Sequence, residues 1–333
     1  MVSARPGVGL PGTVTMREAE ELSAEAEKAG ASGVWVADVR REPYLACAAA
    51  LRATTRVTVG TDVAVAFSRS PAATAQAAWD LAGYGKGRFV LGLGSQVGPT
   101  LLSRFGVEAD QPAARMRDYV LAVRACWDAY RSGRGRYEGE FYSIRQPVFS
   151  PGADDPWPAI PIYVAGVNPV MTAVAGEIAD GFAAHMFCTP IYLDRIIRPA
   201  LARGAARAKR EAPPVLMPLV VGRDRASLAL QITTYTVPAY RRVLDESGLR
   251  EEADAILMAL ADRRRTEAAR IIEERCLDQL GVAVLDELPE RVKLWSGYAD
   301  AIGLTVPWYG LDAAAQVALF RDVLRALERM SLE

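Results

Sequence analysis

The chain has 333 residues, of which 51% are hydrophobic and 24% charged, so it has enough apolar side chains for a large core. Its 39 basic and 40 acidic residues give a formal net charge of −1 without a long basic run, which argues against nucleic acid as a partner. No apolar run is long enough to span a bilayer, and the first residues lack the apolar core of a signal peptide. We therefore expect a cytoplasmic protein without a membrane partner.

Strand and helix patterns alternate along the whole chain. Short apolar runs predict eight strands, at residues 8–10, 33–37, 56–66, 88–93, 161–165, 181–186, 215–221 and 303–306. Helical patterns follow these runs; Thr15 and Glu18 form a capping box for the first helix, and Gly30 ends it. This alternation predicts the α/β class and a (β/α)8 TIM barrel.

The central unit of the chain, residues 56–98, has the pattern strand, helix, strand. Ser70 is a good N-cap and Pro71 a good first residue for its helix. Parallel strands joined in this way end at the same edge, so Gly92, Gly94 and Ser95 indicate open backbone that meets a ligand there. Close packing of the strands is the alternative explanation for the glycines.

Two segments interrupt the alternation. Residues 132–160 are rich in glycine, proline and aromatic residues, and alternation within them predicts a hairpin on a loop insertion. Residues 224–285 are almost wholly helical in pattern and too long for one crossover, which predicts a helical insertion before the last strand. The length alone allows one barrel or two smaller domains; the eight strands favour a single barrel domain over residues 1–333.

Residues that bind metals or form disulfides are sparse. The four cysteines, Cys47, Cys126, Cys188 and Cys276, are far apart and contain no C-x-x-C pair, so we expect reduced, buried thiols. His185 is the only histidine, and we expect no metal site.

Several short motifs occur in a characteristic order along the chain. They are Gly60-Thr61 with residues 64–67, Arg69-Ser70-Pro71, residues 87–89 and 91–96, and then residues 112–117, 138–142, 164–167, 179–181 and 236–240. In their order and spacing, over nearly the whole chain, these motifs resemble the luciferase-like monooxygenase superfamily. The resemblance is closer to its branch of deazaflavin oxidoreductases that use coenzyme F420.

The resemblance implies a barrel that holds a flavin or deazaflavin ring over the mouth formed by the carboxyl ends of its strands. It also implies a non-proline cis peptide in the third strand, by position Asp62–Val63 or its neighbour. The implied cofactor-binding residues are Asp62, Val63 and Ala64 in a bulge behind the ring, Gly92, Gly94 and Ser95 beside the cofactor's side chain, and Ala165, Gly166, Val167 and Asn168 near its phosphate. An ordinary helix capped by Asn168 is the alternative for the last group.

Two residues are candidates for acid–base catalysis. Asp38 follows the second predicted strand, where the family often has an acidic residue followed by histidine, but the next residue here is Val39. A helix cap, or a salt bridge with Arg40 or Arg41, is the alternative role for Asp38. His185 lies near the end of the sixth predicted strand, so either a substrate-side acid–base role or a structural role is open to it.

The leading hypothesis is an oxidoreductase that transfers a hydride between coenzyme F420 and a small organic substrate. The first alternative is an FMN-dependent monooxygenase that receives reduced flavin from a partner reductase. The second is a barrel that binds a cofactor without turnover. Related proteins often pair, so we expect a homodimer, although the sequence identifies no interface patch.

Overall fold

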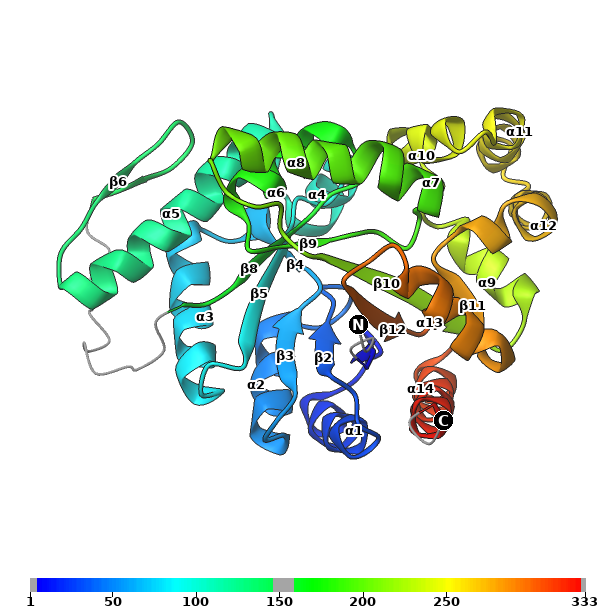
Figure 1. Cartoon of the computed structure of the whole chain (residues 1–333), viewed down its shortest axis with the longest axis horizontal. Helices are drawn as coiled ribbons and strands as arrows, with labels where there is room; N and C mark the ends of the chain where they lie inside the picture. Colours follow the sequence, from blue (N-terminus) through cyan, green and yellow to red (C-terminus); the bar gives the residue numbers. More distant parts are fainter. Residues whose placement is uncertain (1–4, 146–158, 331–333) are drawn as a thin grey trace.

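Eight parallel strands form a closed barrel in the computed structural model, which describes residues 5–145 and 159–330 (Figure 1). Each strand is parallel to its neighbours, and the pairings of β12 with β1 and of β9 with β10 close the ring. In ring order the strands are β1 (Gly7–Gly9), β2 (Gly33–Val36), β3 (Thr58–Thr61), β5 (Phe89–Gly94), β8 (Ile162–Ala165), β9 (Gly181–Ala183), β10 (Val215–Gly222) and β12 (Ala301–Thr305). The eight predicted strands are all present in the predicted order, which confirms the (β/α)8 barrel.

The third predicted strand is divided into two pieces. β3 ends at Thr61, and the second piece is β4 (Ala64–Val65), which pairs with the end of β5. The peptide bond between Asp62 and Val63 is cis, as the resemblance implied. A short helix, η1 (Ala66–Ser68), then leads into α3 (Pro71–Tyr84).

The helices begin and end where local side chains satisfy the backbone. Thr15 accepts a hydrogen bond from the backbone of Glu18 at 3.3 Å, and Glu18 accepts one from the backbone of Thr15 at 2.7 Å, so the predicted capping box is confirmed. Gly30 follows this helix with a φ of 80°, which favours glycine. Ser70 caps α3 by accepting from the amide of Ala73 at 3.1 Å, as predicted.

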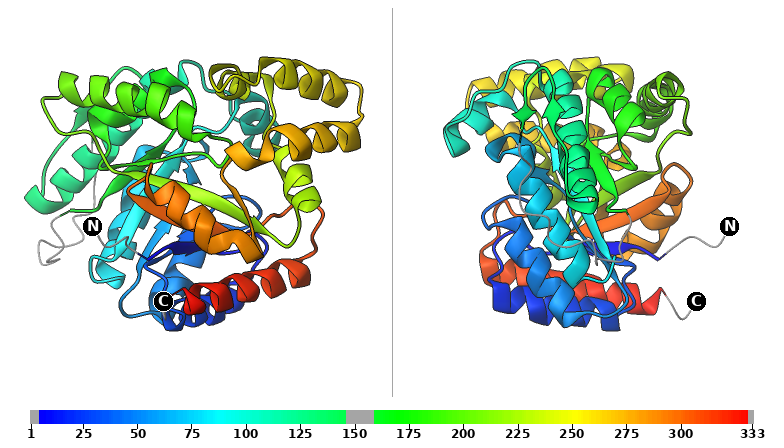
Figure 2. Two further views of the ribbon diagram at one scale, coloured as in Figure 1. Left: turned by 45° about the vertical axis from the view of Figure 1, so that its right-hand side comes forward. Right: turned by 90° about the vertical axis from the view of Figure 1, so that its left-hand side faces the viewer.

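Helices surround the barrel on its outer side (Figures 1 and 2). They are α1 (Met16–Lys28), α2 (Pro43–Ala53), α3 (Pro71–Tyr84), α4 (Gly98–Phe105), α5 (Pro112–Ser132), α6 (Pro169–Ile178), α7 (Pro190–Tyr192), the π-helix η2 (Leu193–Ile197), α8 (Arg198–Arg207), α13 (Leu288–Ser296) and α14 (Ala313–Arg329). Figure 2 shows α14 beside α1, and Arg321 pairs with Glu25 across them at 2.9 Å. The last helix therefore packs against the first and completes the outer layer.

The lumen of the barrel is filled by large side chains, with Trp35 of β2 at its centre. A Cβ atom on Gly7 would lie 2.6 Å from Trp35 Nε1, and one on Gly60 would lie 2.7 Å from Trp35 Cζ3. Tyr163 of β8 lies beside the indole, with 6.3 Å between the ring centroids. Glycines on the neighbouring strands therefore make room for a packed floor below the mouth.

The first insertion carries the predicted hairpin, formed by the antiparallel strands β6 (Tyr137–Glu138) and β7 (Ser143–Ile144). Asp118 on α5 is buried and anchors the hairpin, accepting from the amides of Phe141 at 2.7 Å and Tyr142 at 3.0 Å. Residues 146–158 of the predicted insertion lie outside the described residues.

The second insertion is mainly helical, as predicted. It contains α9 (Arg225–Ile232), η3 (Pro238–Tyr240), α10 (Arg241–Glu246), α11 (Arg250–Ala261), α12 (Arg265–Arg275) and η4 (Leu277–Gln279). The sequence did not predict the short strand at its end, β11 (Val282–Val284), which pairs with the carboxyl end of β10 and leads into η5 (Leu285–Glu287).

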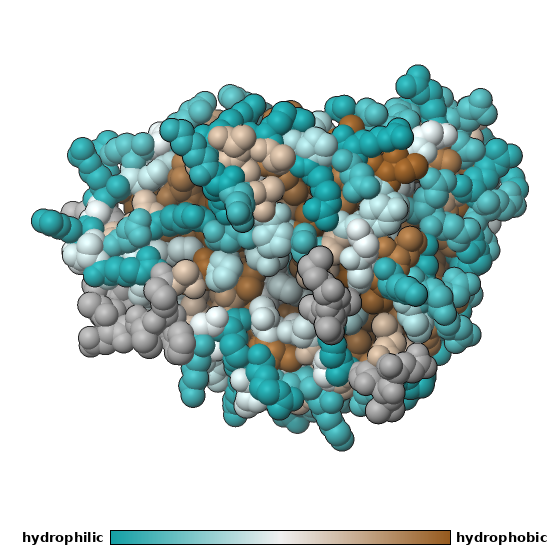
Figure 3. Space-filling view, viewed as in Figure 1, coloured by the Kyte–Doolittle hydropathy of each residue, from teal (hydrophilic) through white to brown (hydrophobic). Residues whose placement is uncertain are grey.

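Hydrophilic side chains cover most of the face shown in Figure 3, and hydrophobic side chains appear there only in patches. The four cysteines are all buried and free, as predicted, and burial raises the pKa of each thiol. Within residues 5–145 and 159–330, no helix combines the length and apolar character needed to cross a membrane.

Candidate active site

The carboxyl ends of the barrel strands surround a cavity of about 660 Å³. Most of the predicted site residues line it: Asp38, Asp62, Val63, Gly94, Ser95, Ala165, Gly166, Val167, Asn168 and His185. Ala64 and Gly92 do not line it. The structure thus brings together residues from five different strand ends at the mouth of the barrel, where enzymes of this fold bind their ligands.

Close packing between strands explains why residue 92 is a glycine. A Cβ atom on Gly92 would lie 1.9 Å from the carbonyl oxygen of Thr61, so a larger residue has no room. The Thr61 hydroxyl also donates to the carbonyl of Gly92 at 2.7 Å and accepts from its amide at 2.9 Å. Ala64 is fully buried in the same layer. Gly92 and Ala64 are therefore packed between strands and do not line the cavity, and a role for them in binding the cofactor stays a prediction.

Gly94 lies beside the cis peptide at the floor of the cavity. A Cβ atom on Gly94 would lie 2.6 Å from Val63 Cγ2, so glycine lets the Val63 side chain approach β5. Val63, Gly94 and Ser95 together form a mostly apolar surface on one side of the cavity. Such a surface can contact the face of a flat ring.

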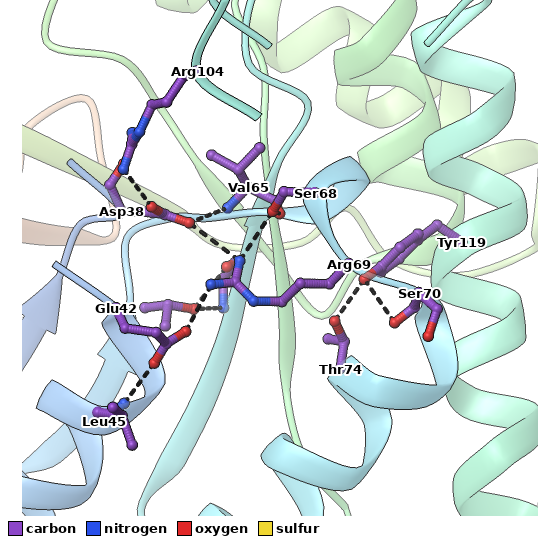
Figure 4. A network of polar contacts seen from close by, with 12 residues as sticks. Asp38, Glu42, Leu45, Val65, Ser68, Arg69, Ser70, Thr74, Arg104 and Tyr119 are labelled. Atoms are coloured by element: carbon purple, nitrogen blue, oxygen red, sulfur yellow. Dashed lines mark hydrogen bonds and ion pairs between the residues drawn. The ribbon is translucent and has the colours of Figure 1, made fainter. Parts of the chain in front are cut away.

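Asp38 is the centre of an ion-pair network at one wall of the cavity (Figure 4). Its carboxylate contacts Arg69 at 3.3 Å and Arg104 at 2.8 Å, and it accepts from the amide of Val65 at 3.2 Å. Arg104 also donates to the carbonyl oxygen of Asp38 at 2.7 Å. Arg40 and Arg41 were the alternative partners that the sequence offered. The observed partners come from later in the chain: Arg69 directly follows η1, and Arg104 lies in α4.

Because both oxygens of the Asp38 carboxylate are engaged, its geometry favours a role in joining the β2–α2 loop to the segment after η1 and to α4, and not a role in proton transfer. Only 3% of its side chain is exposed, whereas Arg69 and Arg104 retain 25% and 30%. The catalytic role of Asp38 stays a prediction, and the network gives it a structural role that the sequence alone did not identify.

His185 lies at the cavity wall opposite Asp38 and is held in one tautomer. The amide of Phe187 donates to His185 Nδ1 at 3.0 Å, which leaves Nε2–H as the donor of the neutral ring. The rings of Tyr235 and Tyr240 lie 4.9 and 5.2 Å from the imidazole, centroid to centroid. Burial among these rings lowers the pKa of His185 from 6.5 to about 4. At neutral pH the residue can therefore donate a hydrogen bond into the cavity but is a poor base.

We expect the single imidazole of this chain to titrate near pH 4 in the folded protein, as measured by NMR of the labelled histidine ring. The folded-state pKa is lowered, so the contribution of His185 to stability is fully present above pH 6.5, declines below it and is gone below about pH 4. The variant His185→Gln should lack that part of the acid destabilisation. A ring titration near pH 6.5 in the folded protein would contradict the assignment.

Two helices begin at the cavity without a side-chain cap. Gln111 and Asn168 are the N-cap residues of α5 and α6, and the side chain of neither accepts a cap hydrogen bond. Asn168 instead donates from Nδ2 to the carbonyl oxygen of Ala239 at 2.9 Å, which ties the α6 loop to η3. The alternative, an ordinary helix capped by the Asn168 side chain, is therefore not observed. A helix start without a side-chain cap leaves backbone N–H groups that attract an anion.

The sequence analysis gave no site role to the residues that complete the cavity wall. They include Gln111, Pro112, Ala113 and Ala114 at the start of α5, Val170 and Met171 at the start of α6, and Tyr235 and Tyr240 from the second insertion. Residues 112–117 and 236–240 are among the motifs that carry the resemblance, so that signal was available for Pro112 and Tyr240. No local pattern shows that the insertion folds back over the mouth.

Taken together, the closed barrel, the apolar cavity at its mouth and the two uncapped helix starts define a TIM barrel with a candidate ligand site at the carboxyl ends of its strands. The chain belongs to the luciferase-like monooxygenase family, whose model matches residues 1–294. This membership confirms the resemblance drawn from the motifs and supports an oxidoreductase.

Known proteins extend this result. An uncharacterised protein of Mycobacterium tuberculosis is 39% identical over 248 residues, which cover 70% of this chain and 73% of the relative. An F420-dependent glucose-6-phosphate dehydrogenase of Rhodococcus erythropolis is 31% identical over 221 residues, covering 60% and 62%. The structure of the coenzyme F420-dependent tetrahydromethanopterin reductase of Methanopyrus kandleri superposes with a TM-score of 0.73 at 18% identity, covering 98% and 97% of the two chains. At that identity the structural likeness supports the fold alone.

Proposed function

We propose that this protein is an F420-dependent oxidoreductase that transfers a hydride between the deazaflavin and a small organic substrate. The observation that carries the proposal is the cavity, in which an apolar floor lies beside two uncapped helix starts. The F420-dependent relative in the same family supports the choice of cofactor.

The residues of the cavity fit a flat ring with a phosphate-bearing side chain. Val63 and Gly94 would contact the ring, and Ser95 would lie beside its substituent. The backbone amides at Gly166 and Val167 and in the first turns of α5 and α6 would hold the phosphate, since no lysine or arginine lines the cavity in the described ranges. When bound, the deazaflavin supplies the carbon that accepts or delivers the hydride.

The side chains of the protein would orient the bound molecules and exclude water from the reacting atoms. Tyr235 and Tyr240 cover one side of the cavity, which limits the access of water to the reacting atoms. His185 would donate from Nε2 to an oxygen or nitrogen of the bound molecule, in agreement with its neutral state. The expected homodimer stays a prediction.

Titration of the purified protein with each cofactor tests the proposal. We expect coenzyme F420 to bind more tightly than FMN, measured by the change in fluorescence of each chromophore. Tighter binding of FMN would favour the monooxygenase alternative, which the family description also supports. Tight binding of F420 without hydride transfer to any substrate in single-turnover experiments would favour a barrel without turnover.

The variant Gly166→Val should raise the dissociation constant for F420 about tenfold or more, equivalent to about 1.4 kcal/mol. A Cβ atom on Gly166 would already lie 3.2 Å from Met171 Cγ and 3.4 Å from the amide nitrogen of Thr172, so valine should displace the start of α6. Gly98→Val is the matched control, because a Cβ there meets no described atom within 4 Å. An unchanged affinity of the Gly166 variant would show that this loop does not hold the cofactor.

A further inference from the structure

A second, smaller cavity of about 90 Å³ lies on the lumen side of the first. The two cavities share the wall residues Ala37, Asp62, Met186, Pro218 and Tyr235, so they are adjacent at the barrel mouth. Trp35 also lines the smaller cavity, which we call the inner cavity. Its volume equals that of about three water molecules in the liquid.

The wall of the inner cavity is largely apolar. Val39 contributes to it, at the position where the family resemblance leads us to expect histidine. The polar side-chain groups in the wall include the Asp62 carboxyl group and the hydroxyl groups of Thr305 and Tyr235, and the described wall contains no lysine or arginine. The inner cavity therefore suits an uncharged molecule with one polar group.

Asp62 is the only carboxyl group in the described wall of the inner cavity. Its amide donates to the carbonyl oxygen of Val36 at 2.8 Å, which fixes its backbone beside β2. No hydrogen bond or ion pair of its carboxyl group is found within residues 5–145 and 159–330, unlike that of Asp38. Burial raises the pKa of Asp62 to about 7, so both of its protonation states are available near neutral pH.

Other titratable groups face the same space. Tyr235 shares the inner cavity with Asp62, and its hydroxyl group accepts a hydrogen bond from Trp308 Nε1 at 3.2 Å. The other titratable groups in the described wall of the larger cavity are Asp38, His185 and Tyr240. The charges of Arg69 and Arg104 are directed at Asp38. Asp62 is therefore the carboxyl group at this mouth that is not already paired.

We propose that the inner cavity is the substrate subsite of the enzyme proposed above, that it takes a small uncharged alcohol or carbonyl compound, and that the Asp62 carboxyl group exchanges a proton with the substrate oxygen. In the oxidising direction the alcohol O–H proton passes to the Asp62 carboxylate, and the electron pair of the O–H bond becomes the second bond of the carbonyl group. The C–H bond on the same carbon breaks, and its hydrogen and electron pair leave as hydride for the oxidised deazaflavin. In the reducing direction, protonated Asp62 returns the proton.

On this proposal, the substrate of the protein differs in charge from that of its glucose-6-phosphate dehydrogenase relative. A phosphorylated sugar carries about two negative charges at neutral pH. The described walls of the two cavities contain no cationic side chain to pair with such a group beside Asp62. Cyclohexanol and cyclohexanone carry one oxygen each and match the polarity of the inner cavity, and part of either ring would lie in the adjoining larger cavity.

Infrared spectroscopy of the unliganded protein tests the protonation of Asp62 without any cofactor. The carbonyl band of a protonated carboxyl group should disappear with a midpoint near pH 7, be absent in Asp62→Asn, and remain in the control Asp128→Asn, whose side chain is 80% exposed. Because the folded-state pKa is raised above 3.8, Asp62 destabilises the fold progressively as pH rises from about 4 to about 7, so Asp62→Asn should raise the melting temperature more at pH 8 than at pH 5. Identical spectra of wild type and Asp62→Asn, or of Asp62→Ala should the asparagine variant not fold, would overturn the proposal.

Single-turnover hydride transfer from cyclohexanol to F420 tests the role in the reaction. Asp62→Asn should slow this step by about 100-fold or more in protein saturated with F420, so that a change in the dissociation constant of the cofactor does not affect the measured rate. Val39→Phe should fill the inner cavity and remove the binding of cyclohexanone, detected by saturation-transfer NMR, with F420 binding retained. A wild-type rate in Asp62→Asn, or binding of cyclohexanone to Val39→Phe, would overturn the inference and leave the proposed function intact. Failure of the wild-type protein to bind F420 would instead reject the proposed function, and the infrared result would still decide the state of Asp62.

Discussion

Replacing Asp38 by alanine should lower the free energy of unfolding by about 3 kcal/mol, measured by urea denaturation. The carboxylate of Asp38 is the buried partner of Arg69 and Arg104. Its removal leaves Arg104 without a counter-charge among the described residues, whereas Arg69 keeps its ion pair with Glu42 at 2.7 Å. This loss of stability lies at the lower end of the range for breaking a buried ion pair, because both arginines keep some contact with solvent.

A matched control distinguishes this network from ordinary surface charge. Arg270 and Glu274 pair at 2.9 Å on α12 with 62% and 52% of their side chains exposed, so Glu274→Ala should change stability by about 0.5 kcal/mol or less. A similarly small change in Asp38→Ala would show that the three joined segments do not depend on the carboxylate. It would also favour the predicted acid–base role of Asp38.

Replacing Gly92 by alanine should destabilise the protein by about 3 kcal/mol or prevent folding. The added methyl group would lie 1.9 Å from the carbonyl oxygen of Thr61, which is backbone and cannot rotate away. The adjoining strands would have to separate at the point where the Asp62–Val63 bulge begins. Thermal unfolding and the yield of soluble protein measure the effect.

Gly98→Ala is the control for the same chemical change. Its Cβ atom would meet no described atom within 4 Å, and alanine is a better helix residue than glycine, so we expect no loss of stability and a gain of up to about 1 kcal/mol. If Gly92→Ala unfolds at the same temperature as Gly98→Ala, the glycine is not required by packing, and a direct role at the ligand returns as an explanation.

The barrel could be predicted from the sequence because its signals are local. Apolar runs, the Thr15 capping box and the Ser70-Pro71 helix start each specify an element from a few neighbouring residues, and all were observed. β11 was missed because its three residues follow a long helical segment and form a strand only through pairing with β10. The cis peptide bond was expected from the resemblance and not from the residue types.

The site was less predictable, because its contacts join distant residues. Asp38 was placed at the mouth correctly, but its partners follow 31 and 66 residues later and replaced the adjacent arginines that the sequence suggested. Gly92 and Gly94 look alike in the sequence, and only the position of the neighbouring strand separates a packing residue from a cavity residue. Tyr235 and Tyr240 lie at the mouth because the second insertion folds over the barrel. No local sequence pattern predicts that path.

Because all four native thiols are buried, a fluorescent dye can be attached selectively at one introduced cysteine. Val170 lines the rim of the larger cavity and is 68% exposed, so Val170→Cys would introduce a thiol far more accessible to a maleimide dye than the native cysteines. A polarity-sensitive dye at that position would register the entry of colourless molecules that the cofactor's own absorbance does not reveal. Compound libraries can then be screened against the mouth of the barrel before any turnover assay exists.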